Sequence, residues 1–218
     1  MSAIKLVVFD MDGTLLEPRS CWAYIHDHFG TDNSDMLQQY LEHKISDQEF
    51  VKADIKLWEN TSEKTINEEY INSILDEIKP IEGAEKLIDE LHRKGIKTAI
   101  ISGGIQYLAN KWADRWKMEF AIANELINDK NGKLKAIINA SGNAKGPIMD
   151  SLLKRMELSK DEVVSIGDTV VDLPLFERSF FSIAVNTADS KVINCVDYHH
   201  LSPDLSDLIP IITKLAKR

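Results

Sequence analysis

The sequence predicts an α/β protein with a doubly wound, Rossmann-like parallel sheet and a small helical cap domain inserted after the first strand. Three observations predict this fold class. Short apolar runs alternate with helical patterns over most of the chain, several of these runs end at polar residues, and one long segment near the start contains helical patterns alone. Alternating strands and helices are typical of a parallel sheet covered on both faces.

The first strand is expected at residues 4–9, where IKLVVF forms a short, nearly continuous apolar run rich in β-branched residues. Such a run is typical of a strand that is buried on both faces. The run ends at Asp10. We therefore expect Asp10 at the carboxyl end of this strand, the edge where open parallel sheets place their active sites.

Residues 16–80 break the alternation, because they show consecutive helical patterns without a strand between them. Ser46 followed by Glu49 is a plausible capping box at the start of the third helix. We predict a catalytic core formed by residues 1–15 and 81–218, and a helical cap domain formed by residues 16–80. Helices within this cap are expected at about 21–29, 34–43, 47–59 and 68–78.

The second part of the chain returns to alternating elements. Apolar residues at helical spacing predict a helix that closes at Gly95, and IKTAII at 96–101 predicts the next strand. A short strand is expected at 120–124, and Asn131 with Gly132 predicts a β-hairpin after it. The remaining elements expected are helices at about 105–117, 147–155 and near 175, and strands at 163–166 and 182–185.

Charge and hydropathy exclude several classes of partner. The 26 basic and 35 acidic residues give a net charge of −9, and no basic block offers the electrostatic footprint of a nucleic-acid-binding protein. No apolar run reaches the roughly 18 to 20 residues of a membrane span, and the first residues do not resemble a secretory signal. We expect a cytoplasmic protein that binds neither nucleic acid nor a membrane. The sequence leaves the oligomeric state open.

The cysteines, histidines and tryptophans suggest structural roles. Cys21 and Cys195 are far apart and lack metal-ligand spacing, so buried spectator thiols are expected rather than a disulfide or a zinc site. The six histidines form no HxxxH or HxxH pair, so solvated or capping roles are expected. Packing is the expected role of the four tryptophans. Trp22 and Trp58 lie in the cap, where contact with a substrate is the alternative.

Two carboxylates, Asp10 and Asp12, lie two residues apart in the segment DMDGT at the end of the first strand. An extended backbone points both side chains the same way, so one could attack while the other moves a proton. A turn rich in Asp and Gly is the alternative interpretation. Ser102 and Asp168 also follow directly on apolar runs, so three separate segments would deliver polar groups to one crevice. This arrangement favours a functional site.

Four short motifs occur in order: FDMDGT, ISGG, NAKG and GDTVVD. Together they resemble the four motifs of the haloacid dehalogenase superfamily, and the match spans the whole predicted core. PIEGAEKLIDEL, ANELI, GDTVVDLPLF and a cap inserted after the first motif are similar to the phosphoserine phosphatase branch. The resemblance implies a phosphomonoester hydrolase that acts on a small phosphorylated metabolite through an aspartyl-phosphate.

The resemblance also implies the catalytic roles. Asp10 would be the nucleophile, and Asp12 would protonate the leaving oxygen and then deprotonate the attacking water. Mg²⁺ would be bound by Asp10, by the backbone carbonyl of Asp12 and by Asp168. Asp172 would hold metal-bound water or orient Lys145. Turn or N-cap acids are the alternative for the last two aspartates, but an Asp four residues after GD is what the last motif requires.

Three further groups would bind the transferring phosphoryl group by the same resemblance. Ser102 and the backbone N–H of Gly103 would donate hydrogen bonds, and Lys145 would add positive charge. A helix cap is the alternative role for Ser102. Lys145 would be an ordinary surface lysine were it not part of NAKG.

Competing functions share parts of this pattern. Asp12 excludes the ion-pumping ATPases, which resemble the first motif but carry Thr there, and the haloacid dehalogenases, which lack the second Asp. A phosphomutase or phosphotransferase of the same superfamily would retain Asp12. A phosphorelay receiver domain also combines aspartates, Ser or Thr and Lys, but its acceptor follows a mid-chain strand and it lacks a helical insert of this size. A silent binding scaffold would be expected to have lost one of the acids.

The residues expected to select the substrate depart from the phosphoserine phosphatase pattern. That branch is understood to use a Glu after the first motif and an Arg on the cap to bind serine. A gapless count places Arg19 and Asp54 at these positions, so both charges are exchanged, and Val171 replaces an Asn in the last motif. Glu17 could substitute for the missing acid. The sequence thus predicts weak activity on phosphoserine and better turnover of another small phosphomonoester, one with an anionic group facing Arg19.

Overall fold

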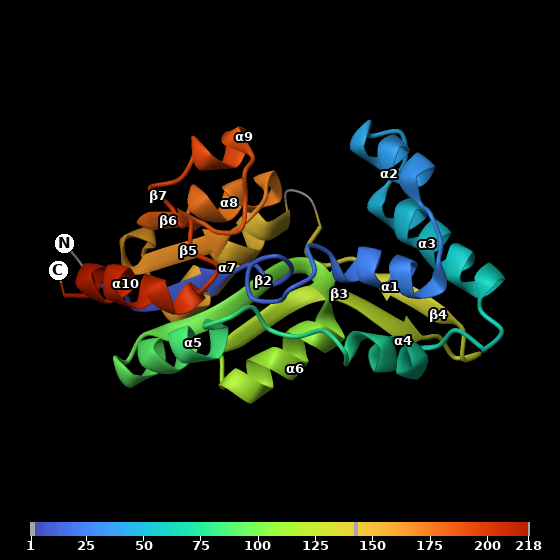
Figure 1. The fold of residues 1–218 in the computed structure, drawn as a ribbon, viewed down its shortest axis with the longest axis horizontal. Coiled ribbons are helices and arrows are strands. Elements are labelled where there is room, and N and C mark those ends of the chain that lie inside the picture. Colours follow the sequence, from blue (N-terminus) through green and yellow to red (C-terminus); the bar gives the residue numbers. More distant parts are fainter. Residues whose placement is uncertain (1–2, 142–143, 218) are drawn as a thin grey trace.

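The computed structural model describes residues 3–141 and 144–217. Within this part of the chain, seven strands form one sheet in the order β4-β3-β2-β1-β5-β6-β7 (Figure 1). Neighbouring strands are parallel except for β3 and β4, which form an antiparallel hairpin. The strands are β1 (Leu6–Phe9), β2 (Lys97–Ile105), β3 (Phe120–Asn128), β4 (Leu134–Ile137), β5 (Val163–Gly167), β6 (Phe181–Ala184) and β7 (Tyr198–His199).

Helices cover both faces of this sheet, and four of them lie between β1 and α5. The fold class expected from the sequence, a parallel sheet with a helical insertion after the first strand, is confirmed. The helices of the insertion are α1 (Cys21–Phe29), α2 (Ser34–Leu41), α3 (Asp47–Thr61) and α4 (Glu68–Leu75). The later helices are α5 (Ala84–Arg93), α6 (Gln106–Trp116), α7 (Lys145–Met156), α8 (Leu173–Phe176), α9 (Ser190–Ile193) and α10 (Ile209–Leu215).

The central strand β1 explains why the sheet is doubly wound. Its side chains alternate between two hydrophobic clusters because successive residues of a strand point to opposite faces. Val7 and Phe9 belong to the cluster that includes residues of α5, α6 and α10, whereas Leu6 and Val8 pack with residues of α7 and α8. All four side chains are fully buried. The continuous apolar run therefore reflects burial on both faces, as predicted.

The chain leaves and re-enters the core at one place. The backbone N–H of Glu17 donates to Lys79 O at 3.0 Å, and that of Ile81 donates to Leu15 O at 2.9 Å. Leu16 and Pro80 form an antiparallel bridge between these bonds. This two-stranded connection supports our proposal that residues 16–80 form a cap and that the core comprises 1–15 and 81–218.

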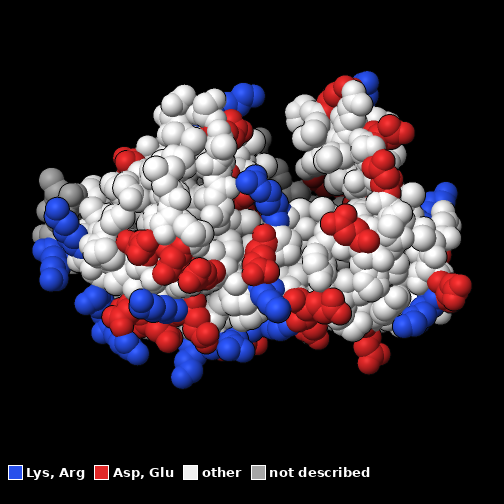
Figure 2. Space-filling view, in the orientation of Figure 1, with Lys and Arg blue, Asp and Glu red and all other residues white. Residues whose placement is uncertain are grey.

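The cap helices extend to one side of the core (Figure 1). α3 packs against β4, while α4 packs against α6 and β3. The space-filling view shows a hollow between the lobe that carries α8 and α9 and the lobe that carries α2 and α3 (Figure 2). Acidic and basic side chains are mixed on the face drawn in that figure. No helix of the described residues combines the length and the apolar character that crossing a membrane requires.

Several expected boundaries and environments differ in the structure. β2 continues to Ile105 rather than ending at residue 101, and β3 continues to Asn128 before the predicted hairpin. The helix expected at 147–155 begins at Lys145, and the helix expected at 68–78 ends at Leu75. β2 lengthens because the polar and glycine residues of ISGG form an irregular part of the strand, where its register with β3 shifts.

The expected environments of three side chains, Cys195, His26 and His200, were wrong. Cys21 is buried as predicted, but Cys195 is exposed. His26 is not solvated: it is buried in the cap, where its Nδ1 accepts a hydrogen bond from Trp58 Nε1 at 3.2 Å. His200 is also buried, with Nε2 3.1 Å from Asp204 O. Local sequence spacing did not reveal the partner of His26, because Trp58 lies 32 residues away on another helix of the cap.

Candidate active site

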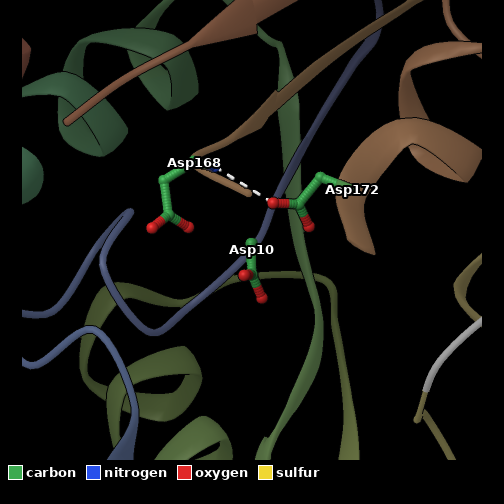
Figure 3. A group of neighbouring side chains, drawn as sticks. All are labelled: Asp10, Asp168 and Asp172. Atoms are coloured by element: carbon green, nitrogen blue, oxygen red, sulfur yellow. Dashed lines mark hydrogen bonds between the residues drawn. The ribbon is translucent and has the colours of Figure 1, made fainter. Parts of the chain in front are cut away.

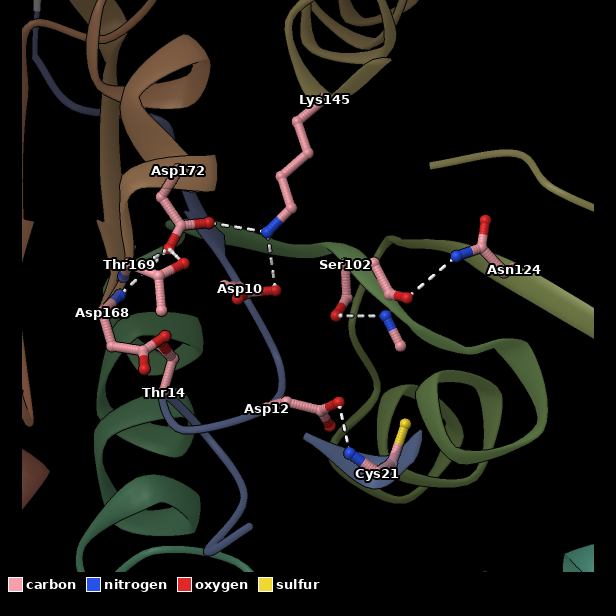
Figure 4. Close-up of polar contacts among 12 residues, drawn as sticks. Asp10, Asp12, Thr14, Cys21, Ser102, Asn124, Lys145, Asp168, Thr169 and Asp172 are labelled. Carbon is pink, nitrogen blue, oxygen red and sulfur yellow. Dashed lines mark hydrogen bonds and ion pairs between the residues drawn. The ribbon is translucent and has the colours of Figure 1, made fainter. Parts of the chain in front are cut away.

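Asp10 and Asp12 lie at the carboxyl end of β1, and both side chains are buried. The backbone N–H of Asp10 donates to Ile166 O at 2.9 Å, which ties the end of β1 to the end of β5. Oδ2 of Asp12 accepts a hydrogen bond from Cys21 N at 2.8 Å, at the start of α1 (Figure 4). The first residue of the first cap helix therefore orients the second carboxylate of the site.

Gly13 allows the loop after Asp12 to pass close to Asp168. Its φ is +71°, a conformation that residues with a Cβ rarely adopt. A Cβ built at this position would lie 2.4 Å from Asp168 Oδ2. The carbonyl of Gly13 also accepts a hydrogen bond from Asn186 Nδ2 at 2.9 Å. Both the backbone conformation and the lack of space thus require glycine here.

Asp10, Asp168 and Asp172 converge from the ends of β1 and β5 and from the short helix after β5 (Figure 3). One carboxylate oxygen from each lies within 4.8 Å of the others, and all three residues are buried. Oδ2 of Asp168 has no hydrogen-bond partner among the described residues. Hard divalent cations prefer such oxygen ligands. The residues present therefore fit a magnesium ion.

Asp172 is held more tightly than the other two acids. Its Oδ2 accepts hydrogen bonds from the backbone N–H groups of Asp168 and Thr169, both at 3.0 Å. Its Oδ1 accepts from Lys145 Nζ at 2.6 Å. Asp168 instead receives a hydrogen bond on Oδ1 from Thr14 Oγ1 at 3.3 Å. Asp172 is thus placed to orient Lys145, one of the two roles expected for it.

Lys145 lies in the first turn of α7 and extends its side chain into the acidic cluster (Figure 4). Its Nζ is 2.9 Å from Asp10 Oδ1 and 2.6 Å from Asp172 Oδ1. The lysine side chain is 1% exposed, so this is a buried charge rather than a surface lysine. Asn143, which precedes it in the NAKG motif, lies outside the described residues.

Burial perturbs the protonation of the acids. It raises the pKa of Asp10 to about 7, with the charge of Lys145 opposing the shift and that of Asp172 adding to it. It raises the pKa of Asp168 to about 8, together with the charges of Asp10 and Asp172. Burial also raises the pKa of Asp12. Without a cation, this cluster therefore holds protons near neutral pH.

Lys145 responds in the opposite way to its surroundings. Burial alone would lower the pKa of its ammonium, but the charges of Asp10 and Asp172 outweigh it and raise the pKa. Lys145 thus stays positively charged over the whole physiological range. A permanent charge at this place compensates Asp10 and is available to an anionic ligand.

Ser102 and Gly103 lie in the irregular part of β2. Ser102 Oγ accepts a hydrogen bond from Gly104 N at 3.1 Å, which leaves its hydroxyl hydrogen to donate elsewhere. Gly103 O accepts hydrogen bonds from Trp22 Nε1 at 3.0 Å and from Asn124 Nδ2 at 2.8 Å. The peptide of this loop is therefore fixed by one residue from the cap and one from β3.

Asn124 and Trp22 are contributors that residue patterns alone did not identify. Asn124 Oδ1 accepts hydrogen bonds from the backbone N–H groups of Asn139 and Ala140, so this side chain joins three segments. In the sequence, only the similarity of the segment ANELI to the phosphoserine phosphatase branch drew attention to Asn124. Packing was the expected role of Trp22, whereas the structure joins it to the loop that carries Ser102 and Gly103.

A cavity of about 290 Å³ lies between the cap and the core beside these groups. We call this cavity the junction cavity. Its core side includes Gly103, Asn124, Lys145 and Val171. The cap side includes Trp22, Tyr40, Asp47, Phe50 and Val51. A larger hollow of about 740 Å³ lies between α3 and the β3–β4 hairpin, away from the acidic cluster. Of these two cavities, the junction cavity reaches Lys145.

The three residues expected to select the substrate lie elsewhere. Asp54 is fully buried inside the cap, where Oδ1 accepts a hydrogen bond from Asn33 Nδ2 at 3.0 Å. Arg19 is exposed and donates through Nη2 to Asn186 O at 3.0 Å. Glu17 is exposed. None of the three is among the described residues that line the junction cavity. This placement gives no support to the prediction that an anionic group of the substrate faces Arg19.

Comparisons with known proteins agree with this geometry. A family model described as haloacid dehalogenase-like hydrolase matches residues 4–179. The phosphoserine phosphatase of Archaeoglobus fulgidus is 30% identical over 196 residues, which cover 85% of this chain and 53% of that protein. The chain thus spans about half the length of this relative. The phosphoserine phosphatase of Methanocaldococcus jannaschii is 28% identical, with 83% of this chain and 84% of that protein covered.

Solved structures give the same result. A phospho-aspartyl intermediate analogue of phosphoserine phosphatase is 26% identical, with a TM-score of 0.79 and coverage of 96% of this chain and 99% of that chain. A substrate-bound phosphoserine phosphatase complex is 25% identical, also with a TM-score of 0.79, and 97% and 99% of the two chains are covered.

Proposed function

Because the chain belongs to the haloacid dehalogenase-like hydrolase family and is a phosphatase of that type, we propose that it hydrolyses a small phosphomonoester with the carboxylate of Asp10 as nucleophile. The observation that carries this proposal is the buried contact of Asp10 with Lys145, 2.9 Å apart, beside two further acids. Attack by a carboxylate oxygen on phosphorus would form an aspartyl-phosphate and release the alcohol.

We propose Asp12 as the general acid and base. It is two residues after Asp10 and also buried, and its Oδ1 has no hydrogen-bond partner among the described residues. Its raised pKa favours the protonated form that must donate to the leaving oxygen. After the alcohol has left, the ionised carboxylate would take a proton from the water that attacks the aspartyl-phosphate. The bond from Cys21 N fixes its orientation in both steps.

The phosphoryl group would be bound by Ser102, by the backbone N–H of Gly103 and by Lys145. The bonds from Trp22 and Asn124 to Gly103 O hold this loop in place before substrate arrives. Such preorganised donors are effective because they need no rearrangement as charge develops on the transferring group. Asp172 would act as a positioning residue, because it fixes the ammonium of Lys145.

Mg²⁺ is the proposed cofactor. Asp10, Asp168 and the backbone carbonyl of Asp12 would bind it, with Asp172 close by. When bound, the ion neutralises the carboxylates and the phosphoryl oxygens and holds them together. The unpaired Oδ2 of Asp168 and the raised pKa values of Asp10 and Asp168 support a cation at this place.

The test is hydrolysis of p-nitrophenyl phosphate by the purified chain, with and without Mg²⁺. We expect turnover that a chelator abolishes and that Asp10→Asn reduces to background, because an amide does not attack phosphorus. Asp161→Asn is the matched control, since Asp161 is exposed on the core and outside the cluster. Phosphate release with saturating Mg²⁺ that survives in Asp10→Asn would contradict the assignment of the nucleophile.

A further inference from the structure

We propose that the junction cavity binds the alcohol part of the substrate and selects a small alcohol that carries an ammonium group and no carboxylate. This inference rests on the proposed function, because it takes Lys145 and Gly103 as the phosphate end of the site. The cavity touches both of these residues and extends from them towards the cap. A phosphomonoester bound with its phosphate at Lys145 would therefore place its alcohol between cap and core.

Aromatic rings dominate the cap side of this cavity. Trp22, Tyr40 and Phe50 line it and are each half-buried. Tyr40 and Phe50 stack with ring centroids 4.9 Å apart and an interplanar angle of 9°, while Trp22 is anchored by its hydrogen bond to Gly103 O. The aromatic surface is therefore held in a fixed position. Rings that surround a pocket attract quaternary and primary ammonium groups through the negative faces of their π-systems.

The charges in the cavity point to the same class of ligand. Asp47 is the one acid among the described lining residues, and Lys145 is the one base. Lys145 is already paired with Asp10 and Asp172, so its charge serves the phosphate end. Oδ1 of Asp47 accepts a hydrogen bond from the hydroxyl of Tyr40 at 2.5 Å. None of the described residues forms an ion pair with Asp47. No basic side chain of the described residues therefore pairs with this carboxylate beside the rings.

A substrate carboxylate would meet the opposite situation. It would lie near the carboxylate of Asp47 and without a free basic partner among the described lining residues, because the other polar side chains of the lining, Ser20, Asn124 and Ser141, are uncharged. A buried anion without such a partner loses its hydration and gains little in return. Arg19, the cation that could have served, donates to Asn186 O outside the cavity. The cavity therefore disfavours an amino acid phosphate and favours an amino alcohol phosphate.

Four esters test the charge of the alcohol: phosphocholine, phosphoethanolamine, O-phospho-L-serine and 3,3-dimethylbutyl phosphate, the uncharged carbon analogue of phosphocholine. We expect kcat/KM for phosphocholine or phosphoethanolamine to exceed that of the other two by about tenfold or more. Equal turnover of phosphocholine and its carbon analogue would overturn the proposal, as would a preference for phosphoserine. Hydrolysis of p-nitrophenyl phosphate is measured in parallel, and its absence would instead refute the proposed phosphatase function.

The role of Asp47 is tested by Asp47→Asn. We expect the preference for the ammonium esters over the carbon analogue to fall by about tenfold. Asp35→Asn is the matched control, because Asp35 is also an acid in the first turn of a cap helix but lies outside the cavity. An equal loss on all esters would mean that Asp47 only maintains the cap, and this result would overturn its assignment.

Discussion

The ammonium of Lys145 lies between two buried carboxylates, 2.9 Å from Asp10 Oδ1 and 2.6 Å from Asp172 Oδ1. Asp172 takes two backbone hydrogen bonds on its other oxygen, so it cannot turn away from the lysine without losing them. The lysine therefore has a fixed position beside the proposed nucleophile. This geometry makes the pair sensitive to the loss of either partner, because a buried charge left alone is costly.

Lys145→Met should lower both stability and activity. Removing the ammonium leaves Asp10 and Asp172 uncompensated, so we expect a loss of about 3–5 kcal/mol in the free energy of unfolding without metal. Mg²⁺ should restore more stability to the variant than to the parent protein, yet kcat should remain about 10²–10³-fold lower. Urea unfolding and p-nitrophenyl phosphate turnover measure the two effects.

Lys154→Met is the control for this experiment, because Lys154 lies on the same helix and is exposed. It should leave both quantities unchanged. A Lys145→Met protein as active as the parent would show that the buried lysine is structural only.

Without metal, the protein should become less stable as pH rises. The pKa values of Asp10 and Asp168 are raised to about 7 and about 8, from 3.8, so the folded state binds more protons than the unfolded state. Their contribution is fully present below about pH 4 and is lost as pH rises through 7 and 8. Melting curves in chelator at pH 5, 6.5 and 8.5 measure this trend.

Mg²⁺ should reverse this loss of stability at high pH. The ion must displace the protons of Asp10 and Asp168, so the increase in Tm at saturating metal should be larger at pH 8.5 than at pH 6.5. Asp168→Asn should reduce both the pH dependence in chelator and the effect of Mg²⁺. A metal-induced shift that is the same at each pH would mean that these carboxyls do not form the binding site.

Asp12→Asn should separate the two halves of the reaction. With nitrophenolate, a leaving group that needs no proton, attack by Asp10 should continue, but the group that activates water is missing. We expect a loss of about 10²–10⁴-fold in turnover and a phosphoenzyme that accumulates. Intact-mass measurement should find one added phosphate, and peptide mapping should place it on Asp10. An unmodified, inactive variant would count against Asp12 acting after the first step.

The sequence predicted those features that depend on local pattern. The apolar run before Asp10 predicted a central strand because both faces of β1 are covered, and the Asn131-Gly132 turn predicted the β3–β4 hairpin. The ends of β2 and α7 were less accurate. ISGG resembles a turn because it is rich in glycine, yet the chain passes through it as an irregular strand that continues to Ile105.

Long-range partners explain what the sequence could not predict about the site. The four motifs identified the acids, Ser102 and Lys145, but no local pattern links Trp22 or Asn124 to Gly103 O. The gapless count that placed Asp54 at a specificity position aligns one helix and does not show which face of that helix is buried. The structure turns Asp54 into the cap and presents Asp47 and Phe50 to the junction cavity instead.

Asp54→Ala should therefore affect the cap rather than the choice of substrate. Asp54 Oδ1 accepts a hydrogen bond from Asn33 Nδ2 and lies 3.2 Å from His26 Nε2, and the His26 ring packs against Trp58. Alanine would remove the partner of buried His26 and of half-buried Asn33, so we expect a loss of about 1–3 kcal/mol in the free energy of unfolding. The ranking of phosphate esters by kcat/KM should stay the same as in the parent protein. Arg19 is the other position where this chain and the phosphoserine phosphatase pattern carry opposite charges. Arg19→Ala should change neither the free energy of unfolding nor the ranking of esters, since Arg19 is exposed and makes its hydrogen bond to Asn186 O outside the cavity. A changed ranking in Asp54→Ala with unchanged stability would show that the acid acts on the substrate, and the specificity role expected from the sequence would then stand.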